Sequence, residues 1–82
     1  MPRVTYRQVR HLLTDVGFQE TPTKGSHLLY VHPAAHAQVV LPRAGDGETV
    51  LPAVWSGIRR TIFEFGIMDP ADVDERLYAA RV

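Results

Sequence analysis

The stretch "LLYVHPAAHAQVVL", residues 28–41, contains two strand-like runs separated by a turn. Residues 28–31 combine an aromatic residue with apolar and β-branched neighbours, which favours a strand. Residues 32–36 interrupt this run, and residues 38–41 resume it before Pro42. A shorter β-compatible run, residues 18–21, precedes them and stops at Pro22. The sequence therefore predicts a three-stranded antiparallel β-meander, followed by a flexible Gly-Asp-Gly loop at residues 45–47.

A helix is predicted before the strands. Thr5 and Gln8 have the spacing of a capping box, and Val4 and Val9 occupy the positions of a hydrophobic staple. Gly17 is typical of the left-handed residue that ends a helix. Between these signals, apolar residues recur at helical spacing: Tyr6, Val9, Leu12, Leu13 and Val16.

Two further helices are predicted after the strands. The second lies within residues 51–65 and ends at Gly66, and either Pro52 is its first residue or Ser56 caps a shorter helix. Its expected apolar stripe consists of Val54, Ile58, Ile62 and Phe65. The third is short and begins after Asp69-Pro70, an acceptor cap followed by a proline in the first turn. Val73 and Leu77 are the apolar residues of this helix that we expect to be buried.

This element order predicts one α+β domain with its helices on one face of the sheet. Residues 1–67 form its body, and residues 68–82 add a short acidic helix packed on it. The other sheet face must meet solvent or a partner. The 82-residue chain has no cysteine and no long apolar run. We therefore expect neither disulfides nor a membrane span, and a cytoplasmic location is natural.

The charge is unevenly distributed although the formal net charge is zero. Residues 1–63 carry an excess of three positive charges, and residues 64–82 carry the matching negative excess. A neutral total argues against a nucleic-acid binder, but a mildly basic body leaves RNA binding open. The acidic residues 69–75 form a solvated helix face, cover part of the basic surface, or meet a partner.

The most specific motif is Lys24-Gly25-Ser26-His27 followed by Tyr30, with Gly17-Phe18 upstream and His32-Pro33 downstream. Over about residues 4–67 the chain resembles the HicA-type toxins of bacterial toxin–antitoxin systems. The resemblance implies a double-stranded-RNA-binding-like α-β-β-β-α fold and a metal-independent endoribonuclease, or mRNA interferase, that cleaves mRNA. It implies that His27 is catalytic and that a HicB-like antitoxin is the protein partner.

The chain departs from the family pattern at several positions. Leu28 stands where the family often has a second histidine, and Arg43-Ala44 follows the third strand's proline where another histidine is frequent. The start of the family's second helix is matched only loosely by Ser56-Gly57-Ile58-Arg59. These departures and the neutral charge keep a second interpretation open, in which the domain binds RNA or a protein without turnover.

The residue types of the motif suit RNA cleavage. An imidazole can move protons near neutral pH, as removal of the 2′-hydroxyl proton or protonation of the leaving 5′-oxygen requires. Gly25 would admit a phosphate, Ser26 and Lys24 would donate to its oxygens, and Tyr30 could stack a base. The alternative is a purely structural role, in which Gly25-Ser26 is a simple turn, His27 is a partly exposed strand residue and Tyr30 packs in the core.

The remaining candidates carry weaker signals. Arg43, Arg59 and Arg60 could follow RNA phosphates or form an ordinary solvated surface. His32 and His36 lack a further metal-ligating partner at suitable spacing, so we expect no metal site and no cofactor.

Overall fold

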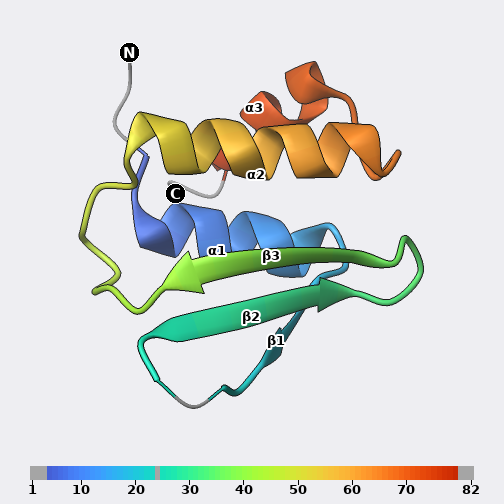
Figure 1. Cartoon of the computed structure of the whole chain (residues 1–82). Helices are drawn as coiled ribbons and strands as arrows, with labels where there is room; N and C mark the ends of the chain where they lie inside the picture. Colours follow the sequence, from blue (N-terminus) through green and yellow to red (C-terminus); the bar gives the residue numbers. More distant parts are fainter. Residues whose placement is uncertain (1–3, 24, 80–82) are drawn as a thin grey trace.

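The computed structural model describes residues 4–23 and 25–79 of the chain. Its elements are α1 (Tyr6–Asp15), β1 (Gln19–Thr21), β2 (His27–His32), β3 (Ala37–Pro42), α2 (Pro52–Glu64) and α3 (Pro70–Ala79) (Figure 1). The strands form an open antiparallel sheet in the order β1-β2-β3. The α+β class and the β-meander predicted from the sequence are thus confirmed.

Helix α1 begins and ends with the predicted signals. The Thr5 hydroxyl accepts a hydrogen bond from the Gln8 amide at 3.3 Å, and the Gln8 side chain accepts one from the Thr5 amide at 2.8 Å. At the other end Gly17 has a φ of +107°, and the Phe18 amide donates to the Leu13 carbonyl at 2.8 Å. This is a Schellman ending, in which a left-handed glycine lets the chain fold back onto its own helix.

The structure decides between the two predicted starts of the second helix, α2. This helix begins at Pro52, so Ser56 lies inside the helix and does not cap it. Its end repeats the ending of α1, with Gly66 at φ +70° and the Ile67 amide donating to Ile62 at 3.0 Å. The predicted apolar stripe is wrong at Phe65, which is 49% exposed. Phe65 is the residue that ends the helix, so it projects beyond the surface that Ile58 and Ile62 bury.

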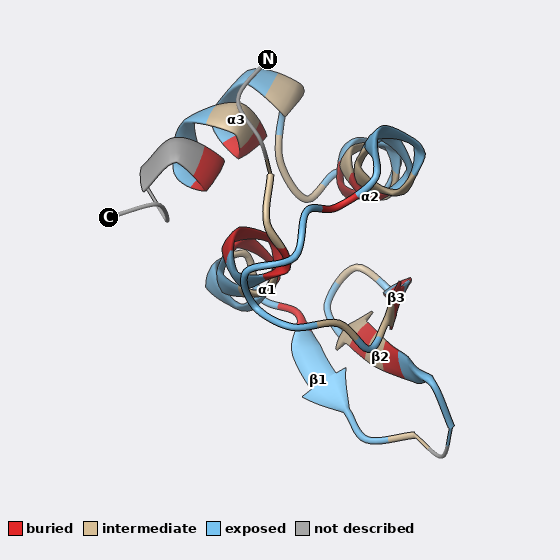
Figure 2. Ribbon diagram, turned by 90° about the vertical axis from the view of Figure 1, so that its left-hand side faces the viewer, coloured by how far each residue is buried: buried red, intermediate tan, exposed pale blue. Residues whose placement is uncertain are grey.

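Side chains alternate between the two faces of the sheet. Tyr30 pairs with Val39 and Leu28 with Leu41, and all four side chains are buried. The helices lie on this side: α1 and α2 contact the sheet, and α3 packs against both helices (Figures 1 and 2). Helix α3 contributes Val73 and Leu77 to the core, as predicted. Among the described residues, no helix has the length and apolar character that crossing a bilayer requires.

The opposite face of the sheet is open and carries no charged residue among the described strand positions. The strand register places Gln19, Val31 and Gln38 side by side and places Thr21 beside Leu29 and Val40. Val40 is 58% exposed. His27 begins β2 on this same face, because it is separated from Leu29 by two positions.

His32 ties the end of α1 to the β2–β3 turn. Its Nδ1 accepts a hydrogen bond from the Ala35 amide at 3.1 Å, so the ring proton lies on Nε2, which is 2.9 Å from the Val16 carbonyl oxygen. Phe18 meets the ring edge-on at 5.1 Å between centroids. Both ring nitrogens have backbone partners, so in this fold neither is available to a metal shared with His36.

Replacing Gly17 with alanine is expected to lower the free energy of unfolding by at least about 1–2 kcal/mol, the typical cost of a left-handed residue with a Cβ. The added Cβ would also lie 2.9 Å from His32 Nε2, which disturbs the bond to Val16. Urea unfolding followed by circular dichroism measures the change. Gly57→Ala is the matched control: Gly57 lies inside α2 with no atom within 4 Å of an added Cβ. That variant should gain roughly 0.5–1 kcal/mol in free energy of unfolding. Equal effects at both positions would contradict the role of Gly17 in ending the helix.

Candidate active site

The predicted catalytic histidine lies at a well-anchored point of the sheet. His27 is the first residue of β2, exposed, and its register partner is Pro42 at the end of β3. The Ser26 hydroxyl is 3.2 Å from His27 Nδ1. One position beyond the paired strands, the Arg43 amide donates to the Ser26 carbonyl at 2.8 Å. The hairpin therefore brings Arg43 beside the motif, although the two are separated by a whole strand pair in the sequence.

The turn before His27 needs a glycine for its backbone conformation. Gly25 has a φ of +102°, in the region that residues with a Cβ rarely adopt. No atom lies within 4 Å of the position that a Cβ would take. The space beside the turn is therefore open, and the backbone can be approached there. Lys24, predicted to contact RNA, lies outside the described residues.

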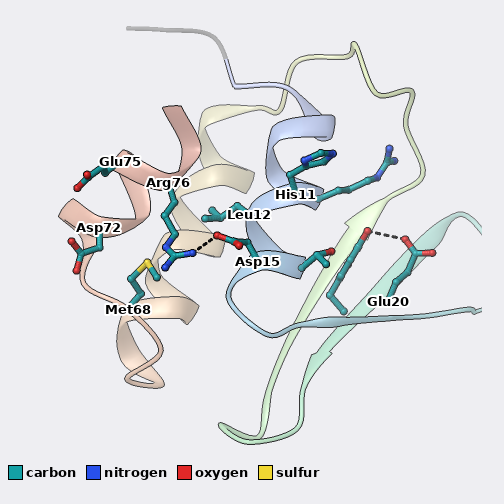
Figure 3. Close-up of a pocket in the computed structure, with 11 residues that line it drawn as sticks. His11, Leu12, Asp15, Glu20, Met68, Asp72, Glu75 and Arg76 are labelled. Carbon is teal, nitrogen blue, oxygen red and sulfur yellow. Dashed lines mark hydrogen bonds and ion pairs between the residues drawn. The ribbon is translucent and has the colours of Figure 1, made fainter. Parts of the chain in front are cut away.

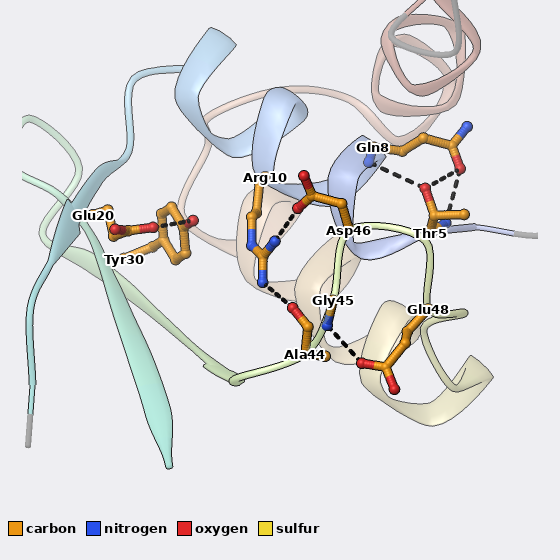
Figure 4. A network of polar contacts seen from close by, with 9 residues as sticks. All are labelled: Thr5, Gln8, Arg10, Glu20, Tyr30, Ala44, Gly45, Asp46 and Glu48. Carbon is orange, nitrogen blue, oxygen red and sulfur yellow. Dashed lines mark hydrogen bonds and ion pairs between the residues drawn. The ribbon is translucent and has the colours of Figure 1, made fainter. Parts of the chain in front are cut away.

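The tyrosine of the motif does not belong to this exposed site. Tyr30 is only 2% exposed and lies on the helix-facing side of the sheet, because it is an odd number of positions from His27. Its hydroxyl donates to Glu20 Oε1 at 2.8 Å (Figure 4). The expected stacking of a base on this ring is therefore wrong for this fold, and the alternative of a core tyrosine is correct.

The two arginines of α2 have partners elsewhere. Arg59 pairs with Asp74 of α3 at 3.0 Å, and Arg60 lies 3.8 Å from Glu64, one turn along its own helix. The structure therefore groups only Arg43, of the three predicted arginines, with His27. Asp74 of the acidic segment thus has a basic partner, whereas Asp69, Asp72 and Glu75 are exposed, as expected for a solvated helix face.

A polar network fastens the loop between β3 and α2 to α1 (Figure 4). The Arg10 guanidinium forms an ion pair with Asp46 and donates to the Ala44 carbonyl at 2.6 Å. Within the loop, the Glu48 carboxylate accepts from the Gly45 amide at 2.6 Å. The Gly-Asp-Gly segment predicted to be flexible is thus held by side-chain interactions at Gly45 and Asp46. Its composition gave no signal of this, because Arg10 is far away in the sequence.

A hollow of about 1010 Å³ lies on another part of the surface, between α1, α3 and the β1–β2 edge (Figure 3). Arg76 of α3 forms an ion pair with Asp15 of α1 across it. Sequence reasoning missed this hollow, because residues of four separate elements, α1, β1, β2 and α3, line it. Its lining combines both charge signs with apolar groups: Arg10, His11, Leu12, Thr14, Asp15, Glu20, Tyr30, Met68, Asp72, Glu75 and Arg76.

The hollow and the histidine of the motif are separate features, since His27, Ser26 and Arg43 are not among the residues that line it. No family model, curated protein or solved structure matches this chain. The resemblance to HicA-type toxins therefore rests on the motif residues and the element order alone.

The surroundings of Tyr30 shift the pKa of its hydroxyl group. Burial, the hydrogen bond to Glu20 and the charge of Glu20 together raise the pKa of Tyr30 to about 12 from an ordinary 10.0, although Arg10 acts in the opposite direction. The folded chain thus holds the phenol proton more tightly than the unfolded chain does. The resulting stabilisation is complete below pH 10 and is lost as the pH rises through 12.

The variant Glu20→Gln is expected to lower the pKa of Tyr30 while leaving it above the ordinary value, because the negative charge is removed and the burial remains. A pH titration of ¹³Cζ-labelled tyrosines by NMR measures the midpoint. Glu48→Gln removes an equivalent charge from the loop and should leave the midpoint unchanged. An unaltered midpoint in Glu20→Gln would show that Glu20 does not influence the phenol.

Proposed function

We propose that this protein is a toxin of the HicA type, a metal-independent endoribonuclease that cleaves single-stranded mRNA with His27 as its proton-transfer residue. The observation that supports this most is the exposed His27 at the start of β2, with Ser26 on Nδ1 and Arg43 beside it. The element order from α1 to α2 is also that of a double-stranded-RNA-binding-like domain, with α3 as an addition. On this proposal a HicB-like antitoxin covers the His27 surface.

RNA cleavage would need two proton transfers, one at the attacking 2′-oxygen and one at the leaving 5′-oxygen. The 2′-oxygen attacks phosphorus as its proton leaves, and the P–O bond to the 5′-oxygen breaks as that oxygen gains a proton. With the Ser26 hydroxyl on Nδ1, Nε2 of His27 is the nitrogen that accepts the 2′-hydroxyl proton or donates a proton to the 5′-oxygen, and solvent water makes the other transfer. In this scheme the Arg43 guanidinium acts on the protein side of the site, where it donates to the Gly25 and Thr23 carbonyls of the turn that carries His27.

A second candidate function is a binding module of the same fold without turnover. The observation that favours it is the open sheet face, which carries exposed Val40 and no charged group among the described strand residues. Such a surface suits a protein partner better than a phosphate backbone. A folded protein that binds RNA or a partner but cleaves no RNA would support this candidate over the enzyme.

Replacing His27 with alanine is expected to reduce the cleavage rate of a single-stranded RNA by roughly 10²–10⁴-fold, the usual contribution of a positioned acid or base. Gel analysis of end-labelled RNA, with EDTA present and equal concentrations of folded protein, measures the rate. His11→Ala is the matched control, because His11 is also exposed but lies on α1 and lines the hollow. Equal cleavage by the wild type and His27→Ala would refute the proposed role.

The biological side of the proposal predicts that induced expression of the wild-type chain arrests bacterial growth. The reason is that cleaved mRNA cannot support translation. Colony counts after induction measure the effect, and His27→Ala, expressed to the same level, should restore growth. Growth arrest that persists in His27→Ala would mean that the toxicity does not come from RNA cleavage by His27.

A further inference from the structure

Arg43 makes an unusual set of hydrogen bonds to the turn that carries His27. Its Nε donates to the Gly25 carbonyl at 2.9 Å, and its Nη2 donates to the Thr23 carbonyl at 3.1 Å. Its main-chain amide donates to the Ser26 carbonyl at 2.8 Å. A single residue at the end of β3 thus supplies the hydrogen-bond donors for three carbonyls of the turn.

The turn has one further internal bond. The Thr23 hydroxyl donates to the His27 carbonyl. With this bond, the carbonyl groups of Thr23, Gly25, Ser26 and His27 all have partners, although the residues themselves are on the surface. An exposed turn with a left-handed glycine would otherwise be free to sample other conformations. The fixed geometry here therefore depends on donors that come from the neighbouring strand.

The guanidinium group is suited to this task and an ammonium group is not. The five N–H groups of arginine lie in one plane and point in fixed directions, so two of them can bind two carbonyls at once. Lysine has a similar charge but presents its donors from a single atom on a flexible stem. The backbone of Arg43 is also fixed, because this residue directly follows the six paired residues of β3.

We propose that Arg43 is a positioning residue, whose fork fixes the turn before β2 and thereby holds His27 and Ser26 in their reactive arrangement. Its effect on catalysis rests on the proposed ribonuclease function, and its effect on the order of the turn does not. This role differs from the phosphate contact expected from the sequence, since Nε and one Nη2 hydrogen are already used within the protein.

The test compares the wild type with Arg43→Lys, which keeps the charge and the main-chain hydrogen bond but removes the fork. Arg7→Lys is the matched control, because Arg7 is exposed on α1 and lines neither the turn nor the hollow. Backbone ¹⁵N relaxation at Gly25 and Ser26 reports the order of the turn, with Tyr30 in the middle of β2 as an internal reference. Cleavage kinetics on single-stranded RNA separate kcat from KM.

We expect the order parameters of Gly25 and Ser26 to fall in Arg43→Lys from about 0.85 towards 0.6, while that of Tyr30 stays unchanged. We expect kcat to fall by roughly 10- to 100-fold with KM within about twofold, because a displaced catalytic group affects the reaction more than binding. Arg7→Lys should change neither the order parameters nor kcat.

Three results would overturn the proposal: unchanged order parameters in Arg43→Lys, a loosened turn with unchanged kcat, or a raised KM with unchanged kcat, which would indicate a phosphate contact. If the wild type cleaves no RNA, the ribonuclease function fails separately. The relaxation data then still decide whether the fork of Arg43 fixes the turn.

Discussion

The pairing of β2 with β3 is the constraint on which the rest of the structure depends. Six residue pairs in one register place Leu28, Tyr30, Val39 and Leu41 on the side of the helices. A shift by one residue would turn these side chains to solvent and expose the opposite set to the core. The same register brings the end of β3 against the turn before β2, so the packing of the core and the geometry of the candidate site are set together.

The two ends of this hairpin are fastened to α1 in different ways. At the β2–β3 turn, His32 joins the Val16 carbonyl at the end of the helix to the Ala35 amide. At the other end, Arg10 holds the loop after β3 through Asp46 and Ala44. Such ties matter in a small domain, because their hydrogen bonds and ion pairs offset the entropy of ordering segments that bury few apolar atoms of their own. The hairpin is thus tied to α1 at both of its ends, while α2 packs on β3.

Local patterns in the sequence predicted most of the fold. The capping box at Thr5, the glycines at 17 and 66 and the proline-bounded strands act through neighbouring residues, and all are found where expected. Interactions between distant residues were not predictable in this way. The contact of Arg10 with the loop after β3, the hollow between α1 and α3 and the burial of Tyr30 depend on tertiary packing. For the candidate site, the motif identified the turn and His27, but its link to Arg43 required the strand register.

Because the chain is translated from its N-terminus, the turn before β2 is made before Arg43, which supplies its hydrogen-bond donors. Until residue 43 has left the ribosome and paired with Ser26, three carbonyls before β2 lack the donors that hold them in the finished fold. The core residues of α2 and α3 are translated later still. A partly synthesised chain therefore carries the histidine without the framework around it, and the arrangement at His27 is acquired only with the completed domain.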